Sequence, residues 1–193
     1  TIRMNLKSKI RNKLYLIKTN FINFIVLRIL KKPFLKSIPF SILFSNFIFK
    51  FFFRLNANSK FLVHFTSKIQ GSENIILPNK NFDSILRSFA SSGGCYYAIF
   101  SGSTLKIGEN TIWSTNVCIQ TGNHDLLNRN KLHINSVEIG NNCWIGSGAV
   151  ILAGVILGDN VTVGANSTVT KSFPSNCVIG GSPARLIKYI NVN

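Results

Sequence analysis

The chain has 193 residues, of which 46% are hydrophobic, and its 22 Lys and Arg against 6 Asp and Glu give a net charge of +16. This length allows one domain with a sizeable core plus an extension. A strongly basic chain can indicate nucleic-acid binding, but charges are sparse in the second half and no recognition-helix, RNP or zinc-finger pattern occurs. We therefore expect no nucleic-acid partner.

Residues 1–60 form a basic segment that differs from the rest of the chain. They hold 13 of the Lys and Arg and 10 of the 16 Phe, whereas the first acidic residue is Glu73. The cations form two clusters, Lys7, Lys9, Arg11, Lys13 and Arg28, Lys31, Lys32, Lys36. Cations interleaved with apolar residues suit a surface that is anionic outside and apolar beneath. We predict a helical extension that contacts the inner face of the membrane through residues 1–56; the alternative is a set of helices packed on the end of the next domain.

Residues 34–53 are long enough to be considered as a membrane-spanning helix. Lys36, Pro39 and Lys50 interrupt this segment, and a central charge costs about 3 kcal/mol on insertion scales. We therefore expect no spanning helix. We also expect no secretory signal, because no clean apolar core is followed by a small-residue cleavage site.

A six-residue repeat begins after this segment, first over 107–119 and then almost unbroken from Ile139 to Val169. Position one is a branched aliphatic residue, position two is usually Gly, and position five is small or β-branched. Six residues turn about 600° around an α-helix, so the stripe would drift by about 120° per repeat, and the period instead favours a flat-sided coil. We predict a solenoid whose position-one residues stack internally, with the position-two glycines providing the special dihedrals at the corners.

A polar stretch over 120–137 interrupts the repeat and is expected to project as a loop. It contains His124 and, nine residues later, His133. Imidazole titrates near neutral pH and can take the proton of a hydroxyl group as that group attacks. His124 is our candidate general base, with His133 as the alternative.

The four cysteines, Cys95, Cys118, Cys143 and Cys177, show no CxxC spacing. We interpret them as reduced structural thiols, which favours a cytoplasmic protein. The basic segment would attach such a protein peripherally to the inner face of the membrane. His64 alternates with apolar neighbours and is predicted to be structural. The spacing of the three histidines does not place them at equivalent points of neighbouring coils, so we expect no metal site.

Three motifs accompany the repeat: Gly-Asn-Asn-Cys-Trp-Ile-Gly over 140–146, Gly-Ala-Asn-Ser-Thr-Val-Thr-Lys over 164–171 and Gly-Gly-Ser-Pro-Ala-Arg-Leu-Ile-Lys over 180–188. Together they resemble the hexapeptide-repeat acyltransferases, in particular the maltose/galactoside type of O-acetyltransferase. The resemblance covers about residues 61–190. It implies an all-β solenoid, a left-handed parallel β-helix of triangular section with one hexapeptide per face, preceded here by the extension over 1–60.

The resemblance also implies a reaction, the acetyl-CoA-dependent acetylation of a hydroxyl group. In this family a His on the extended loop is the general base, and Thr-Gly-Asn-His-Asp over 121–125 matches its local pattern. Asn123 and Asp125 flank His124 and are candidates to orient its ring or bind the acceptor. We expect direct transfer in a ternary complex, with the backbone N–H of Ser147 stabilising the oxyanion.

Donor-binding residues follow from the same resemblance. Residues matching Ser147 and Ala165 line the groove for the pantetheine arm, and three cations match positions near the nucleotide phosphates. The full set is Trp144, Ser147, Ala165, Thr170, Lys171, Arg185 and Lys188. The family places its active sites between the subunits of a trimer, so we expect a homotrimer.

The acceptor is expected to be a sugar hydroxyl of a surface polysaccharide or another glycan intermediate assembled at the inner membrane face. One alternative is a free small molecule, such as a sugar or an antibiotic, for which the basic extension would be dispensable. The other is a non-catalytic or metal-dependent β-helix protein.

Overall fold

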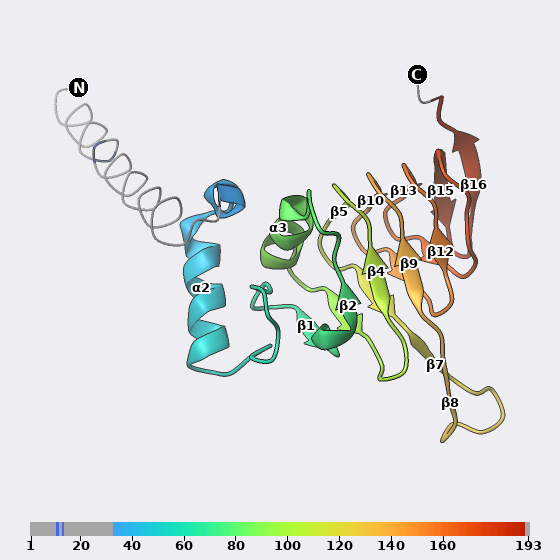
Figure 1. Ribbon diagram of the computed structural model, residues 1–193, viewed down its shortest axis with the longest axis horizontal. Coiled ribbons are helices and arrows are strands. Elements are labelled where there is room, and N and C mark those ends of the chain that lie inside the picture. Colours follow the sequence, from blue (N-terminus) through green and yellow to red (C-terminus); the bar gives the residue numbers. More distant parts are fainter. Residues whose placement is uncertain (1–10, 12, 14–32, 192–193) are drawn as a thin grey trace, which may run out of the picture.

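The computed structural model describes residues 11, 13 and 33–191. Its helical elements in the range 33–191 are η2 (Pro33–Ser37), α2 (Phe40–Phe51), η3 (Ser72–Asn74) and α3 (Asp83–Ser91). The remainder is built mainly from short strands that stack side by side (Figure 1). In the predicted basic extension, Lys7, Lys9, Arg28, Lys31 and Lys32 lie outside the described residues.

Three sheets form the body of the molecule. The first sheet contains β1 (Lys68–Gln70), β3 (Tyr96–Ala98), β6 (Cys118–Gln120), β11 (Val150–Ile151) and β14 (Thr168–Val169). The second contains β2 (Ile75–Ile76), β4 (Leu105–Ile107), β9 (Val137–Ile139) and β12 (Ile156–Leu157). The third contains β5 (Ile112–Trp113), β10 (Trp144–Ile145), β13 (Thr162–Val163), β15 (Cys177–Gly181) and β16 (Ala184–Tyr189). All pairs in these sheets are parallel except β15 with β16.

The strand register shows a three-sided coil. From β9 to β14 the chain visits the second, third and first sheets in rotation, and Ile145 pairs with Val163, 18 residues later. The same step of 18 residues joins Ile151 to Val169. Each of these regular turns therefore consists of three hexapeptides. The position-one residues are buried as predicted, namely Ile139, Ile145, Ile151, Leu157, Val163 and Val169, and so are the small residues of position five.

The prediction that the position-two glycines provide special dihedral angles at the corners is wrong. Positive φ occurs instead at position four, for example at Asn142 (53°), Gly148 (70°) and Asn160 (57°). Asn tolerates this left-handed conformation better than most residues with a Cβ. Position two needs Gly because the coils touch there: a Cβ at Gly140 would lie 2.5 Å from the Gly158 backbone.

The helix α3 was not predicted by the repeat, and it covers the open edge of the third sheet. Three serines one turn apart face β5. Ser84 Oγ donates to Thr111 O at 3.4 Å, Ser92 Oγ donates to Trp113 O at 2.9 Å, and Ser88 Oγ accepts from Trp113 N at 3.3 Å. The hydroxyl groups thus satisfy backbone groups that a further strand would otherwise pair.

The segment 34–53 folds as two helical elements separated near Pro39. The longer one, α2, has 12 residues. Within the range 33–191 no helix is long and apolar enough to cross a membrane. One side of α2 rests on the body through Asn46, whose Nδ2 donates to Ala90 O at 2.8 Å. Ile42 and Leu43 also pack on a small apolar cluster with Leu35, Ile38 and Ala90.

Candidate active site

The loop predicted over 120–137 contains a β-hairpin. Its strands β7 (Gly122–His124) and β8 (Leu132–Ile134) pair antiparallel, with His124 opposite Leu132. The hairpin leaves the coil between β6 of the first sheet and β9 of the second, and it projects beyond the sheets (Figure 1). Leu105 pairs with Val137, 32 residues later instead of 18, so the excursion adds 14 residues to this turn.

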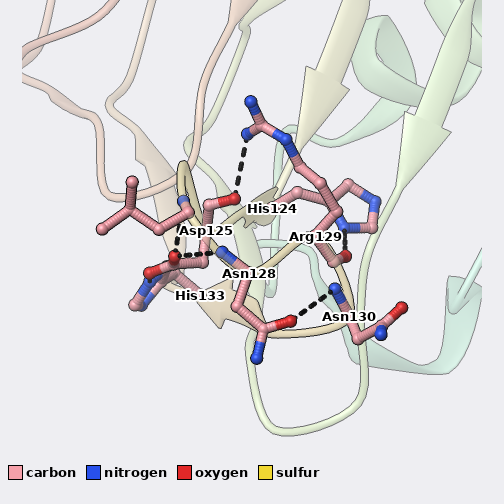
Figure 2. Close-up of polar contacts among 7 residues, drawn as sticks. His124, Asp125, Asn128, Arg129, Asn130 and His133 are labelled. Carbon is pink, nitrogen blue, oxygen red and sulfur yellow. Dashed lines mark hydrogen bonds and ion pairs between the residues drawn. The ribbon is translucent and has the colours of Figure 1, made fainter.

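The hairpin fixes the tautomer of His124. The Nδ1 atom lies 2.7 Å from the carbonyl oxygen of Arg129, as drawn in Figure 2. A carbonyl oxygen only accepts hydrogen bonds, so Nδ1 must carry a proton, and in the neutral ring Nε2 then presents the lone pair. The residue is exposed, and no other hydrogen bond to its ring occurs among the described residues. His124 is therefore arranged as a proton acceptor through Nε2.

Asp125 makes no direct hydrogen bond to the His124 ring among the described residues, and its carboxylate has other partners. Its Oδ2 lies 2.7 Å from Nε2 of His133 (Figure 2), and its Oδ1 accepts from the backbone N–H of Leu127 and Asn128, each at 2.9 Å. The hydrogen bond from His133, followed by those two N–H groups, lowers the pKa of Asp125 to about 2. His133, the alternative base, is thus committed to this carboxylate.

Asn123 belongs to a separate polar pair. Its Oδ1 accepts from Gln120 Nε2 at 3.0 Å, which ties the first strand of the hairpin to the end of β6. Asn123 is opposite His133 in the hairpin. The amide therefore supports the base of the hairpin, and no hydrogen bond from it to the His124 ring occurs among the described residues.

The predicted donor residues Ser147 and Ala165 lie at another corner of the coil. Both follow strands of the third sheet and precede strands of the first, one turn apart. Ser147 Oγ is 2.6 Å from Ser114 Oγ, a neighbour that the sequence did not suggest. Within the described chain, the backbone N–H groups of Ser147 and Ala165 donate to no acceptor. Two donors are therefore available here to a bound molecule.

The remaining predicted donor residues are spread toward the C-terminal end of the coil. Trp144 is exposed on β10, and Thr170 is exposed just after β14. Lys171 Nζ lies 5.7 Å from the ring centre of Phe173. The strand β16 carries Arg185, whose Nη1 donates to Ala184 O at 3.1 Å, and Lys188, which pairs with Val178. None of these residues is joined to the hairpin by a hydrogen bond or ion pair within 33–191.

Other ionisable groups do not build a competing site in the described ranges. His64 is buried, Thr66 N donates to its Nδ1 at 3.2 Å, and burial lowers its pKa. Burial raises the pKa of Cys118 and Cys143, which disfavours a thiolate nucleophile. No group of three His, Cys, Asp or Glu side chains within these ranges could hold a metal ion. A polar cavity of about 370 Å³ between Arg54 and Glu73 includes none of the predicted site residues.

Comparison with known proteins finds a family model that matches the repeat. Residues 136–171 match the family model described as bacterial transferase hexapeptide (six repeats). The predicted resemblance is confirmed. This hexapeptide segment comprises the turns that carry Ser147 and Ala165, and it begins just after the His124 hairpin.

Curated relatives align with about half of this chain. A galactoside O-acetyltransferase of Escherichia coli (strain K12) is 44% identical over 92 residues, which are 46% of this chain and 45% of that protein. WbbJ of the same organism, provisionally named a lipopolysaccharide biosynthesis O-acetyl transferase, is 35% identical over 50% of this chain and 56% of its own length. The crystal structure of a maltose O-acetyltransferase from Clostridium difficile 630 aligns with a TM-score of 0.53 and 34% identity, covering 65% of this chain and 64% of that one. The chain thus spans about half the length of the curated relatives it matches.

Sequence reasoning missed the contacts that hold the candidate base. The Arg129 carbonyl is a backbone group and leaves no residue-type signal. The hydrogen bond between Asp125 and His133 joins side chains from the two sides of the hairpin. It can be inferred only when the register of β7 and β8 is known.

Proposed function

We propose that the chain is an acetyl-CoA-dependent O-acetyltransferase that acts on a sugar hydroxyl, with His124 as general base. The observation that carries this proposal is the hydrogen bond from Nδ1 of His124 to Arg129 O, because it leaves Nε2 free to accept a proton. The similarity to galactoside and maltose O-acetyltransferases supports the type of reaction and the sugar acceptor. The coil is proposed to be left-handed, as the resemblance implies.

The transfer would proceed in one enzyme-bound complex. His124 Nε2 takes the hydroxyl proton while the hydroxyl oxygen attacks the thioester carbonyl of the donor. The N–H of Ser147, which donates to no acceptor within the described chain, is proposed to bind the resulting oxyanion. Collapse of the intermediate breaks the C–S bond, and the thiolate of coenzyme A receives the proton from the imidazolium. Ala165 contributes to the donor groove, and Trp144, Thr170, Lys171, Arg185 and Lys188 are proposed to line or bind its outer part.

A homotrimer would complete this site. The hairpin with His124 leaves the coil between the first and second sheets, whereas Ser147 and Ala165 lie between the third and first sheets. One chain therefore presents the base and the donor corner on different edges, and a neighbouring subunit could bring them together. Analytical ultracentrifugation should give a trimer; a fully active monomer would contradict this assembly.

The proposed acceptor is a glycan intermediate at the inner membrane face, with residues 1–56 in peripheral contact with that membrane. The similarity to WbbJ supports the glycan, and the excess of cations before Glu73 supports the anionic surface. The full chain should sediment with anionic liposomes at low salt and be released at high salt. Attachment that only detergent reverses would contradict peripheral binding.

A free sugar is the second candidate acceptor, because the 44% identical relative is named a galactoside O-acetyltransferase. Release of free coenzyme A thiol from acetyl-CoA, measured over a panel of galactosides, maltose and glycan precursors, distinguishes the two. We expect turnover that requires both acetyl-CoA and a hydroxyl-bearing sugar. If no sugar in the panel stimulates thiol release, the proposed reaction is wrong.

A further inference from the structure

The outer side of α2 carries a stripe of phenylalanines. Phe40, Phe44, Phe47 and Phe51 recur at a spacing of three or four residues, which places them on one side of the helix. We call them the phenylalanine face. Their rings associate in pairs, Phe40 with Phe44 at 5.9 Å and Phe47 with Phe51 at 4.5 Å between centres. Phe44 remains 55% exposed and Phe47 50%, so α2 presents a contiguous apolar surface.

Two other residues of α2 hold the helix to the body by hydrogen bonds. Asn46 Nδ2 donates to Ala90 O, and Asn46 Oδ1 accepts from the backbone N–H of Phe65, each at 2.8 Å. Lys50 Nζ donates to two further carbonyl oxygens, at 2.6 and 2.9 Å. These contacts fix the rotation of the helix. The phenylalanine face therefore cannot turn inward without breaking them.

The positive charge of the residues in and around α2 favours an anionic membrane as the partner. The described stretch 33–72 contains Lys36, Lys50, Arg54, Lys60 and Lys68 and no acidic residue. A protein partner can be of either charge, whereas an anionic bilayer offers negative charge above an apolar layer. Twelve residues of α-helix extend about 18 Å, less than the roughly 30 Å of a bilayer core. A helix of this length can lie along the surface.

We propose that the phenylalanine face of α2 inserts into the headgroup region of an anionic lipid bilayer, with the helix axis along the membrane surface. This rests on the membrane contact proposed above and deepens it, because it assigns the apolar part of the attachment to four residues. The cations outside α2 then contribute electrostatic attraction to the anionic lipids, and the phenylalanine rings contribute apolar area that is buried in the bilayer.

Liposome co-sedimentation of the full chain tests the proposal. The vesicles are phosphatidylcholine with or without phosphatidylglycerol, and the variant is the double substitution Phe44→Ser, Phe47→Ser. The matched control is Leu127→Ser, which alters a 98% exposed residue at the tip of the His124 hairpin. We expect the double variant to bind anionic vesicles about 10- to 100-fold more weakly than the wild type, since each ring loses the burial of an apolar side chain. The control should bind like the wild type.

The outcomes separate the two membrane proposals. If the full chain does not bind anionic vesicles at all, the membrane contact itself is wrong. If it binds and the double variant binds equally well, the contact is real but the phenylalanine face is not its site. Sedimentation equilibrium without lipid tests whether a second copy of the chain occupies the phenylalanine face. A smaller assembly for the double variant would show that the face packs against another copy, and this result would overturn the proposal.

An independent observation in the hairpin supports a second proposal. The Asp125 carboxylate accepts from three donors, the backbone N–H groups of Leu127 and Asn128 and the His133 ring, and Arg129 directly follows the segment that these bonds close. Arg129 Nη1 donates back to Asp125 O at 2.9 Å (Figure 2). The position of the Arg129 carbonyl, which holds His124, therefore depends on the Asp125–His133 pair.

We propose that Asp125 and His133 are positioning residues that keep His124 in the tautomer with its proton on Nδ1. This rests on the proposed function of His124 and adds two residues to it. Neither residue needs to contact the substrates. Their contribution is the shape of the turn, and a displacement of about 1 Å at a catalytic group can cost up to about 100-fold in rate.

The tautomer can be read directly by ¹⁵N NMR of histidine-labelled protein, which contains only three histidines. In the wild type at high pH, His124 should carry its proton on Nδ1. Asp125→Ala and His133→Ala should move it toward the Nε2 tautomer and lower kcat by about 10- to 100-fold with little change in the KM for acetyl-CoA. His133→Gln keeps an N–H donor and should restore most of both readouts. Lys131→Ala, in the same hairpin, is the control.

The free enzyme suffices for the spectra, so the two ideas fail separately. An inactive wild type with the Nδ1 tautomer would reject the proposed reaction and leave the positioning intact. A wild type with its proton on Nε2, or an Asp125→Ala variant with an unchanged tautomer and rate, would overturn the positioning role.

Discussion

The repeated coil and the single hairpin achieve order in different ways. In the regular part of the coil, buried aliphatic residues such as Ile139, Ile145 and Ile151 have equivalents 18 residues later, so one sequence rule is applied several times. In the hairpin, each contact occurs once, and polar groups such as the Asp125 carboxylate hold the turn where no core exists. The coil thus provides stability, and the hairpin provides an exposed, oriented imidazole. Substitutions in the two regions should have separable effects.

The largest expected effect is on turnover and comes from the hairpin. His124→Ala should lower kcat by about 10²–10⁴ because it removes the proton acceptor. Coenzyme A binding and the midpoint of urea unfolding should stay near wild type, because the side chain is exposed. Steady-state kinetics and urea titration measure both. A spared His124→Ala variant together with a severely impaired His133→Ala variant would transfer the role of base to His133.

A buried coil residue should show the opposite profile. Ile151→Ala removes a fully buried side chain and should lower the free energy of unfolding by about 2–5 kcal/mol. Leu127→Ala, at the exposed hairpin tip, should change it by less than about 0.5 kcal/mol. Urea denaturation of both variants provides the measurement. Comparable losses at the two positions would mean that the hairpin is also part of the stable core.

The proposed donor cations should affect binding more than chemistry. Lys171→Ala and Arg185→Ala should each raise the KM for acetyl-CoA by about tenfold and change kcat less, because phosphate contacts lie far from the reacting carbonyl. A truncated donor without the nucleotide provides the control. If the variants lose as much activity with this donor as with acetyl-CoA, the cations do not bind phosphate.

The smallest effect concerns the coil corners. Asn142 adopts a φ of 53°, so Asn142→Ala should cost about 1 kcal/mol of stability, whereas Asn142→Gly should cost little. Thermal or urea unfolding of the pair would measure the difference. Equal stability of the Ala and Gly variants would show that the backbone strain at position four is negligible.

Much of the coil could be predicted from sequence because its period is local and repeated. The burial of Ile145 and Val163 follows from their place in the hexapeptide. The prediction that Gly140 is needed for its dihedral angles is wrong, because a close approach between neighbouring coils has no signature within one repeat. In the candidate site, His124 could be found from residue type and motif. Its partner could not, since a backbone carbonyl such as that of Arg129 is the same in every residue.

The serines of α3 and of its C-cap, Ser92, have a consequence beyond local hydrogen bonding. A stack of identical parallel coils has no intrinsic stopping point, and an uncovered end could accept the end of another molecule and grow into a fibre. At β5 the hydroxyl groups of Ser84, Ser88 and Ser92 occupy the polar backbone sites that such growth would use. At the other edge of the same sheet, β16 runs antiparallel and breaks the register. The third sheet is thereby given a finite length, so the protein can keep a self-complementary architecture without polymerising along it.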